Sequence, residues 1–193
     1  MKSDIILAGV GGQGILSIAA VLGEAAVAEN LYLKQAEVHG MSQRGGDVQS
    51  NLRLSSDPIA SDLIPKGKAD LIISLEPMEA LRYLPYLAEK GMIVTNSEPF
   101  INIDPYPSQE VLAQTYAQIS HKVIIDAEKI AKEETGTPRT ANMVILGAAS
   151  AFIDLEFVTI ENAVRRIFAR KGEEMVAMNI KALHAGRKAA QHN

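Results

Sequence analysis

A glycine-rich hexapeptide near the amino terminus constrains the fold of this chain more than any other feature. Residues 9–14 read GVGGQG and match the pattern G-x-G-x-x-G. The short apolar run Ile5–Ala8 comes directly before it, and an alanine- and leucine-rich stretch from Ile15 to Glu29 follows. Glycines at this position allow a tight turn from a buried strand into a helix, and they let a ligand approach the helix N-terminus. The sequence therefore predicts a strand–loop–helix unit with a candidate phosphate-binding loop.

Short strand-like segments alternate with helix-like segments through most of the chain. Strands are predicted at 31–38, 48–54, 70–75, 92–96 and 122–126, and helices at 77–89 and 108–118. From Thr137 onward the pattern is helical, with an apolar run at 143–152 and a final helix at 173–190. This order predicts an α/β fold with a Rossmann-like, mostly parallel sheet flanked by helices and a helical C-terminal part. We expect one domain over residues 1–193, with the sheet region at 1–135 and the helical part at 136–193.

The composition excludes several kinds of chemistry. The chain has no cysteine, which rules out disulfides, cysteine-ligated zinc, thiolate catalysis and an iron–sulfur cluster held by this chain. Its four histidines lie far apart in the sequence, so we expect no metal site. The net charge of −4 argues against a general nucleic-acid binder. We find no signal-peptide or membrane-spanning pattern and expect a cytoplasmic protein.

Three interpretations of the glycine loop can be weighed from its residues. A P-loop is disfavoured, because Ile15 and Leu16 follow Gly14 where a lysine and a hydroxyl residue are required. A dinucleotide site needs an acidic residue near the end of the second strand, and Glu37 is a candidate. The residues after Glu37 are not the usual passage from a strand into a helix, however. Alternatively, the glycines serve only close packing of strand against helix and bind no ligand.

A second glycine-rich segment lies between two predicted strands. Residues 39–47 read HGMSQRGGD and place His39, Ser42, Gln43 and Arg44 on one polar loop. Arginine offers forked donors to an anion, and neighbouring glycines let a ligand or a partner approach the backbone. The pattern around Ser42 begins like a nucleophile elbow, but Arg44 replaces its final glycine and no histidine–aspartate pair can be chosen. We therefore expect a surface for an anion or a partner, without hydrolase activity.

Three further polar residues occupy positions worth testing. Glu76 and Asn96 fall at the C-terminal ends of predicted strands, where open α/β sheets gather ligands. Polar residues that end strands at the surface are more common, and we expect that situation for both. Asn142 lies within an apolar helical segment and is expected to be a packed polar residue or an interface contact.

Taken together and in order, the two loops resemble a known family. The string GVGGQG, followed by AEVHGMSQRGG before a strand, is similar to the gamma-type subunits of the 2-oxoacid:ferredoxin oxidoreductases. Within that family the resemblance is strongest to the beta subunits of the indolepyruvate:ferredoxin oxidoreductases, in which this domain is a separate small chain. The similarity continues through LEPMEALRYLP at 75–85 and NMVILGA at 142–148. Either glycine string alone is a weak signal, whereas the ordered pair is specific.

The resemblance implies a subunit of an EC 1.2.7 type oxidoreductase that oxidatively decarboxylates 2-oxo acids to acyl-CoA and passes electrons to ferredoxin. The 2-oxo acid implied is indolepyruvate or another arylpyruvate. Thiamine diphosphate and iron–sulfur clusters are then expected on a large alpha subunit as partner, in agreement with the absence of cysteine here. The isolated chain is expected to be inactive, and we assign it no catalytic residue and no metal ligand.

We predict that the two glycine loops form one crevice, because both should follow C-terminal strand ends. The expected cofactor-binding residues are Gly9, Gly11, Gly12, Gln13, Gly14, His39, Ser42, Gln43 and Arg44. The crevice would hold a phosphate-bearing group of coenzyme A or contact the partner subunit. Two alternatives stay open, namely a stand-alone NAD(P)-binding oxidoreductase and a scaffold subunit with no small-molecule site. The sequence specifies neither the preferred 2-oxo acid nor self-association of the chain.

Overall fold

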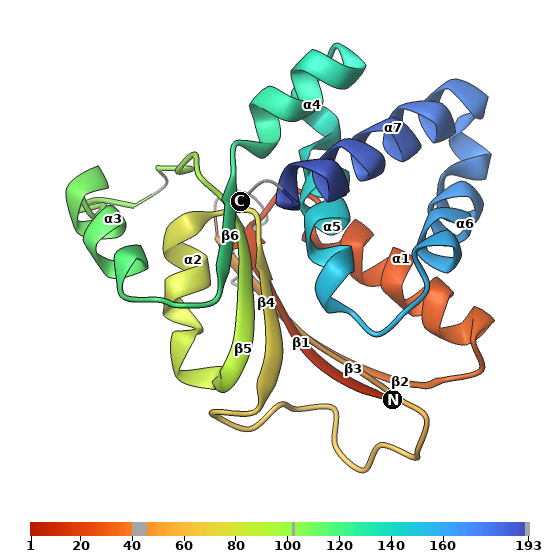
Figure 1. Cartoon of the computed structure of the whole chain (residues 1–193), viewed down its shortest axis with the longest axis horizontal. Coiled ribbons are helices and arrows are strands. Elements are labelled where there is room, and N and C mark those ends of the chain that lie inside the picture. The colour runs from red at the N-terminus through yellow and green to blue at the C-terminus, as the bar shows by residue number, and fades with distance from the viewer. Residues whose placement is uncertain (40–45, 102, 192–193) are drawn as a thin grey trace.

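A computed structural model describes residues 1–39, 46–101 and 103–191, with a six-stranded sheet at its centre (Figure 1). The sheet has the order β2-β3-β1-β4-β5-β6. Its strands are β1 (Lys2–Val10), β2 (Tyr32–His39), β3 (Asp47–Ser55), β4 (Ala69–Ser74), β5 (Leu87–Asn96) and β6 (Lys122–Ile125). Strands β1, β4, β5 and β6 pair in parallel, whereas β3 runs antiparallel to both β1 and β2. The expected α/β fold with a mostly parallel sheet is confirmed, with β3 as the reversed strand.

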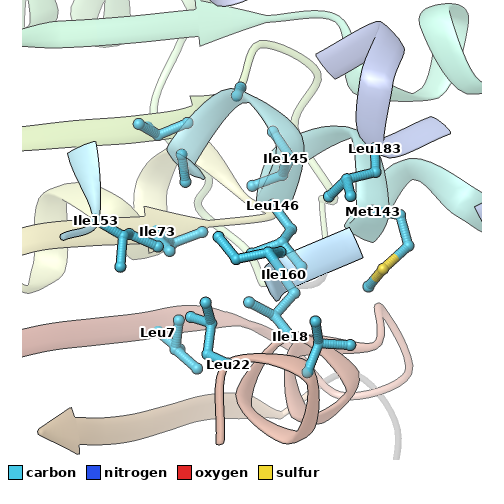
Figure 2. Packing of buried hydrophobic residues seen from close by; sticks show 14 of the residues in the cluster. Leu7, Ile18, Leu22, Ile73, Met143, Ile145, Leu146, Ile153, Ile160 and Leu183 are labelled. Carbon is cyan, nitrogen blue, oxygen red and sulfur yellow. The ribbon is translucent and has the colours of Figure 1, made fainter. Parts of the chain in front are cut away.

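Helices pack on both faces of the sheet (Figure 1). They are α1 (Ile15–Ala28), α2 (Pro77–Arg82), α3 (Gln109–Ala117), α4 (Ala127–Thr135), α5 (Ala141–Ala149), α6 (Phe157–Phe168) and α7 (Glu173–Ala190). The larger core lies between the sheet and α1, α5, α6 and α7, and includes Leu7, Ile18, Leu22, Ile73, Leu146, Ile160 and Leu183 (Figure 2). A smaller core lies under α2 and α3 on the other face. The central strands are apolar on both sides for this reason.

Helices α5 and α7 cross with their backbones in contact. A Cβ added to Gly147 would lie 1.9 Å from the carbonyl oxygen of Leu183. A Cβ added to Gly186 would lie 1.8 Å from the carbonyl oxygen of Val144. Only glycine fits at either position, so α7 is fixed against α5 at a distance that no side chain allows.

Two predictions about helices differ from the structure. The helix expected over 77–89 ends at Arg82, and a 3-10 turn at Leu84–Tyr86 leads into β5 at Leu87. Pro85 has no backbone N–H to donate and restricts the residue before it, which explains the early end. Helix α4 was not predicted, whereas α6 lies within the part expected to be helical from Thr137 onward but received no bounds of its own. The buried residues Ile160, Val164 and Phe168 of α6 recur at helical spacing.

Candidate functional site

The glycine loop lies where the direction of chain connection changes within the sheet. From β1 the chain proceeds through α1 to β2 and β3 on one side, whereas β4 pairs with β1 on the other side. Gly12 and Gly14 have φ angles of 104° and 87°, in the region that favours glycine. Gly14 is the N-cap of α1, so no side chain caps this helix and no acidic residue lies in its first turn. The first N–H groups of α1 thus remain available to an anionic ligand.

Gln13 shapes this loop with its side chain. Its Oε1 accepts a hydrogen bond from the backbone N–H of Val10 at 2.8 Å, and its Nε2 donates to the carbonyl oxygen of Leu75 at 3.1 Å. The loop after β1 is thereby tied to the end of β4. Gly9 serves packing, because a Cβ there would lie 2.9 Å from Cγ1 of Ile15 and 3.0 Å from Oε1 of Gln13.

The described flanks of the two glycine loops lie side by side. Strands β1 and β2 point in the same direction, so both loops follow strand ends at one edge of the sheet, the carboxyl edge. The backbone N–H of Gly11 donates to the carbonyl oxygen of Gly46 at 2.8 Å. Ser42, Gln43 and Arg44 lie outside the described residues, and His39 is described only as the last residue of β2. The binding role expected for these four residues stays a prediction.

A pocket of about 950 Å³ opens at the carboxyl edge of the sheet. Gly11, Gly12, Gln13 and Gly14 line one side of it. The rest of the lining comes from the segment that leads into α5, the first half of α7 and several single side chains. These residues are 137–142, Met175, Met178, Asn179, Ser17, Leu75, Asn96, Phe100, Glu128, Phe168 and Lys171. Ligand pockets typically enclose about 300–1,000 Å³. The volume is therefore sufficient for a nucleotide-sized ligand.

The N-termini of α1 and α5 meet in this pocket. Asn142 Nδ2 donates to the carbonyl oxygen of Gly14 at 3.3 Å, and Asn142 Oδ1 accepts from the N–H of Met143 at 2.9 Å. Like α1, α5 has no side-chain cap and no acidic residue in its first turn. By contrast, side chains of Glu76, Ser108 and Asp126 cap α2, α3 and α4. The helix ends left uncapped here present partial positive charge to the pocket.

Two cationic side chains add to this positive charge. Arg139 lies in the 3-10 turn Pro138–Thr140 that leads into α5, and no hydrogen bond or ion pair of its guanidinium is found among the described residues. Lys171 Nζ lies 5.2 Å from the centroid of the Phe168 ring, and both residues line the pocket. Glu128 is the acidic residue in the lining. The balance of charge favours an anionic ligand.

Glu76 and Asn96 were expected at the surface, and for both the expectation is wrong. Glu76 is fully buried and accepts hydrogen bonds from the N–H groups of Glu79 at 2.8 Å and Phe100 at 3.4 Å and from the Tyr106 hydroxyl. Burial raises the pKa of Glu76 above its usual value, against the opposing effect of these hydrogen bonds. Asn96 is also buried, and its Oδ1 accepts from the N–H of Ala127 at 2.9 Å. Both side chains fasten loops at the carboxyl edge.

Several lining residues of the pocket were missed by the sequence reasoning. Arg139, Lys171, Met175, Met178 and Asn179 come from segments that carry no recognisable binding motif. A usable signal existed for Arg139 alone, because it is a cation directly before an apolar helix that begins without an acidic residue. Asn142 matches its expectation, since it is 8% exposed and packed against the glycine loop.

Comparison with known proteins agrees with this geometry. Residues 4–189 match the model of the pyruvate ferredoxin/flavodoxin oxidoreductase family. The indolepyruvate oxidoreductase subunit IorB of Pyrococcus horikoshii is 37% identical over 97% of this chain and 96% of its own length. The IorB subunit of Archaeoglobus fulgidus is 33% identical over 96% of this chain and 94% of its own length. The common gamma subunit of the pyruvate/ketoisovalerate oxidoreductases of Pyrococcus furiosus is 30% identical over 83% of this chain and 84% of its own.

Solved structures share the fold. The gamma subunit of a keto/oxoacid ferredoxin oxidoreductase from Geobacter sulfurreducens superposes with a TM-score of 0.73 at 23% identity, over 99% of both chains. A 2-oxoglutarate:ferredoxin oxidoreductase from Magnetococcus marinus, solved with 2-oxoglutarate, coenzyme A and succinyl-CoA bound, gives a TM-score of 0.77 at 22% identity. That match covers all of this chain and 31% of the larger one. The chain thus belongs to the pyruvate ferredoxin/flavodoxin oxidoreductase family, as a small gamma-type subunit of the 2-oxoacid:ferredoxin oxidoreductases.

Proposed function

We propose that this chain holds the phosphate-bearing part of coenzyme A in its carboxyl-edge pocket, as the small subunit of an oxidoreductase that acts on indolepyruvate or a related arylpyruvate. The observation that carries the proposal is the meeting of two uncapped helix N-termini at the Gly14–Asn142 contact, with Arg139 and Lys171 on the same pocket. Coenzyme A binding by the Magnetococcus marinus relative, and the IorB names of the similar chains, support the choice of ligand and substrate.

The reactive groups of the enzyme belong, in this proposal, to a large partner subunit in the cytoplasm. Thiamine diphosphate and iron–sulfur clusters there would supply decarboxylation of the 2-oxo acid and electron transfer to ferredoxin. This chain contains no cysteine, and the part that the structure describes has no cluster of side chains suited to a metal. No helix among the described residues is long and apolar enough to cross a membrane. In this proposal the residues of this chain bind and orient coenzyme A, and the partner subunit breaks the bonds of the 2-oxo acid.

The pocket offers distinct surfaces to the parts of coenzyme A. The N–H groups at the start of α1 suit phosphate oxygens, whereas at the start of α5 those of Ala141 and Met143 already donate to Pro138 O and Asn142 Oδ1. Each of the two helix ends still contributes roughly half a positive charge. Arg139 offers a planar fork of donors that matches a phosphate, and Lys171 offers a mobile ammonium. Met175 and Met178 form an apolar wall for the uncharged part of the ligand. Phosphates held in this way would leave the thiol end free to extend toward the partner subunit.

Anaerobic capture of the tagged chain from its native cytoplasm tests the proposal. We expect recovery of a large subunit with bound thiamine diphosphate and iron–sulfur clusters, and of 2-oxoacid:ferredoxin activity that depends on coenzyme A. Titration of that complex with coenzyme A by calorimetry should show saturable binding. Recovery of the chain alone, in a form that shifts the fluorescence of NAD(P)H, would instead identify a stand-alone nicotinamide-dependent oxidoreductase. If substitutions in this pocket leave the coenzyme A affinity of the complex unchanged, the chain is a scaffold subunit without a small-molecule site.

A further inference from the structure

The buried face of α7, a helix that lies wholly within the described residues, includes a polar side chain. The four buried residues of this helix are Asn179, Ala182, Leu183 and Gly186. Asn179 is 3% exposed and, unlike the other three, lines the carboxyl-edge pocket. Asparagine is less favourable than alanine or leucine inside a helix, because its side chain competes for backbone hydrogen bonds. An asparagine at this position therefore needs a reason outside the helix.

The amide of Asn179 has a partner at one end. Its Nδ2 donates to the carbonyl oxygen of Met175 at 2.7 Å. A carbonyl oxygen can only accept, so this contact fixes the amide with Nδ2 toward Met175 and Oδ1 directed away from it. No donor to Oδ1 is found among the described residues. A buried acceptor without a donor destabilises a fold, and native structures contain few of them.

The hydrogen bond to Met175 does not account for the asparagine. Met175 lies four residues before Asn179 within α7, so its carbonyl oxygen is the helical acceptor of the backbone N–H of Asn179. The side chain therefore adds a second donor to an oxygen that is already satisfied. A leucine of similar size would leave no backbone group of the helix without a partner. The fold gains little from this amide, whereas the pocket gains an acceptor.

The surroundings of this acceptor suit a planar base with an amino group. Met175 lies one turn before Asn179 on the same side of α7, and Met178 and Phe168 line the same pocket. Thioether and aromatic side chains pack well against flat rings. Adenine has such a ring face and carries an exocyclic amino group at its edge, and asparagine recognises adenine through this group in other settings.

We propose that Asn179 Oδ1 accepts a hydrogen bond from the exocyclic amino group of adenine, so that this side chain selects the adenine base of coenzyme A. The inference rests on the proposed function and assigns the base of the ligand to the α7 wall of the pocket. The phosphates then bind at the start of α1 and at Arg139 on the same pocket. A base with an oxygen in place of the amino group presents an acceptor to an acceptor, and the site rejects it.

Calorimetric titration of the assembled complex with coenzyme A and with its hypoxanthine analogue tests this contact. The analogue has a carbonyl oxygen at the position of the amino group and is unchanged outside the base. We expect the wild-type complex to bind coenzyme A about tenfold more tightly than the analogue. Asn179→Leu removes the acceptor at similar volume, so its affinities for the two ligands should agree within about twofold. Retention of the tenfold preference by Asn179→Leu would overturn the proposal.

Asn51→Leu is the matched control, because Asn51 is a buried asparagine with a structural role. Asn51 is 4% exposed, and its Oδ1 accepts from the N–H of Ile64 at 3.2 Å. We expect this variant to have a lowered melting temperature and an unchanged preference for coenzyme A over the analogue. Asn179→Leu should show the reverse, namely a melting temperature without ligand at or above that of the wild type and a lost preference.

The outcomes that overturn this contact differ from those that overturn the proposed function. Equal affinity of the wild-type complex for the two ligands rejects the contact with the base and leaves coenzyme A binding intact. An equal loss of affinity for both ligands in Asn179→Leu would then identify a different donor, such as an amide N–H of the pantetheine arm. If the wild-type complex binds neither ligand, the proposed function fails and this inference fails with it.

Discussion

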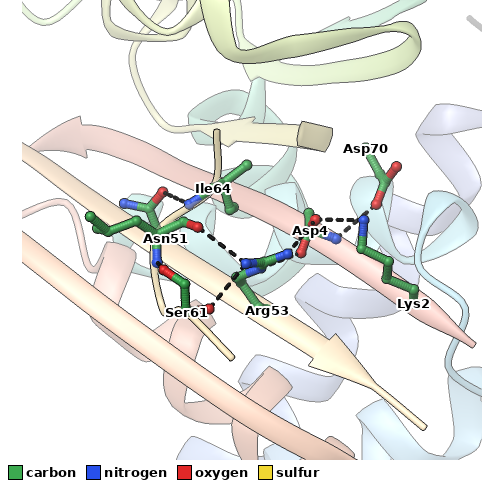
Figure 3. Close-up of polar contacts among 8 residues, drawn as sticks. Lys2, Asp4, Asn51, Arg53, Ser61, Ile64 and Asp70 are labelled. Atoms are coloured by element: carbon green, nitrogen blue, oxygen red, sulfur yellow. Dashed lines mark hydrogen bonds and ion pairs between the residues drawn. The ribbon is translucent and has the colours of Figure 1, made fainter. Parts of the chain in front are cut away.

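The two edges of the sheet use polar residues in opposite ways. At the amino edge, the buried carboxylate of Asp4 is bound by Arg53 Nε at 2.7 Å and by Lys2 Nζ at 2.8 Å, and Asp70 accepts the N–H of Asp4 at 2.8 Å (Figure 3). At the carboxyl edge, α1 and α5 begin without a side-chain cap, and the guanidinium of Arg139 has no partner among the described residues. The Asp4 carboxylate at the first edge is satisfied within the fold, whereas the Arg139 guanidinium and the start of α1 at the second are available to a ligand.

At the amino edge, Arg53 fastens the connection between β3 and β4 to the sheet. Besides its bond to Asp4, its guanidinium donates to the carbonyl oxygens of Ser61 at 3.0 Å and Leu63 at 3.1 Å (Figure 3). The N–H of Ile64 donates to Asn51 Oδ1 at 3.2 Å. The long connection from β3 to β4 is thereby held against the sheet, with Ile64 buried in the smaller core. These contacts stabilise the fold and lie at the far ends of the strands that carry the pocket.

The largest loss of stability is expected from a substitution that removes the ion pair at the amino edge. Arg53→Ala leaves the carboxylate of Asp4, which is 1% exposed, without its main partner. Removal of one member of a buried ion pair typically costs roughly 3–5 kcal/mol. Urea unfolding should show a loss in this range, with unchanged coenzyme A affinity under conditions where the variant is folded. Arg166→Ala is the control, because its pair with Glu24 is largely exposed and should contribute at most about 1 kcal/mol.

A smaller loss of stability, together with a loss of binding, is expected from Gly14→Ala. The φ of Gly14 is 87°, which costs roughly 1–2 kcal/mol for a residue with a side chain. The new Cβ would also lie 2.7 Å from Nδ2 of Asn142 and push the starts of α1 and α5 apart. Gly67→Ala shares the positive φ but meets no atom within 4 Å, so it should cost stability and leave coenzyme A binding unchanged. Equal ligand affinities in the two variants would contradict a binding role for the Gly14–Asn142 contact.

Arg139→Gln should lower the affinity for the ligand without lowering the stability of the fold. Because its guanidinium has no partner among the described residues, we expect unfolding free energy within about 0.5 kcal/mol of the wild type. Coenzyme A affinity, measured by calorimetry on the assembled complex, should fall about tenfold, which corresponds to about 1.4 kcal/mol. Arg170→Gln is the matched control, since Arg170 is exposed and does not line the pocket. A melting temperature lowered by Arg139→Gln would assign this arginine to the fold instead.

The smallest effect concerns the pH dependence of stability. Burial alone would raise the pKa of Asp4, but hydrogen bonds from Arg53 and Lys2 outweigh it and lower the pKa below 3.8, the ordinary value. The stabilisation by this carboxylate is therefore fully present above that value and is lost as the pH falls through the lowered pKa. Urea unfolding between pH 5 and pH 2.5 should show the difference between the wild type and Asp4→Asn shrinking toward low pH. A constant difference would show that the ionisation of Asp4 is not coupled to folding.

The sequence was a good guide to the strands and to the glycine loop. Apolar runs such as Ile5–Ala8 are local signals, and the GVGGQG string carries both its turn and its helix start within a few residues. The opposite wall of the pocket could not be predicted in this way. Lys171, Met175 and Asn179 reach the glycine loop only through the packing of α7 on α5, and long-range packing leaves no pattern in a single sequence. The burial of Glu76 was missed for the same reason, since Tyr106 lies thirty residues further on.

The contact of α5 with α7 at Gly147 and Gly186 means that the two walls of the pocket are synthesised at different times. Residues 11–14 leave the ribosome early and are made together with the first strand and helix. Their counterparts at 171–179 appear only near the end of translation, and they take their place only once Gly186 has reached Val144. For most of its synthesis a nascent chain thus carries the glycine loop without the residues that form the opposite wall of the pocket. Retention of coenzyme A, the proposed ligand, would therefore report that α7 has docked on α5.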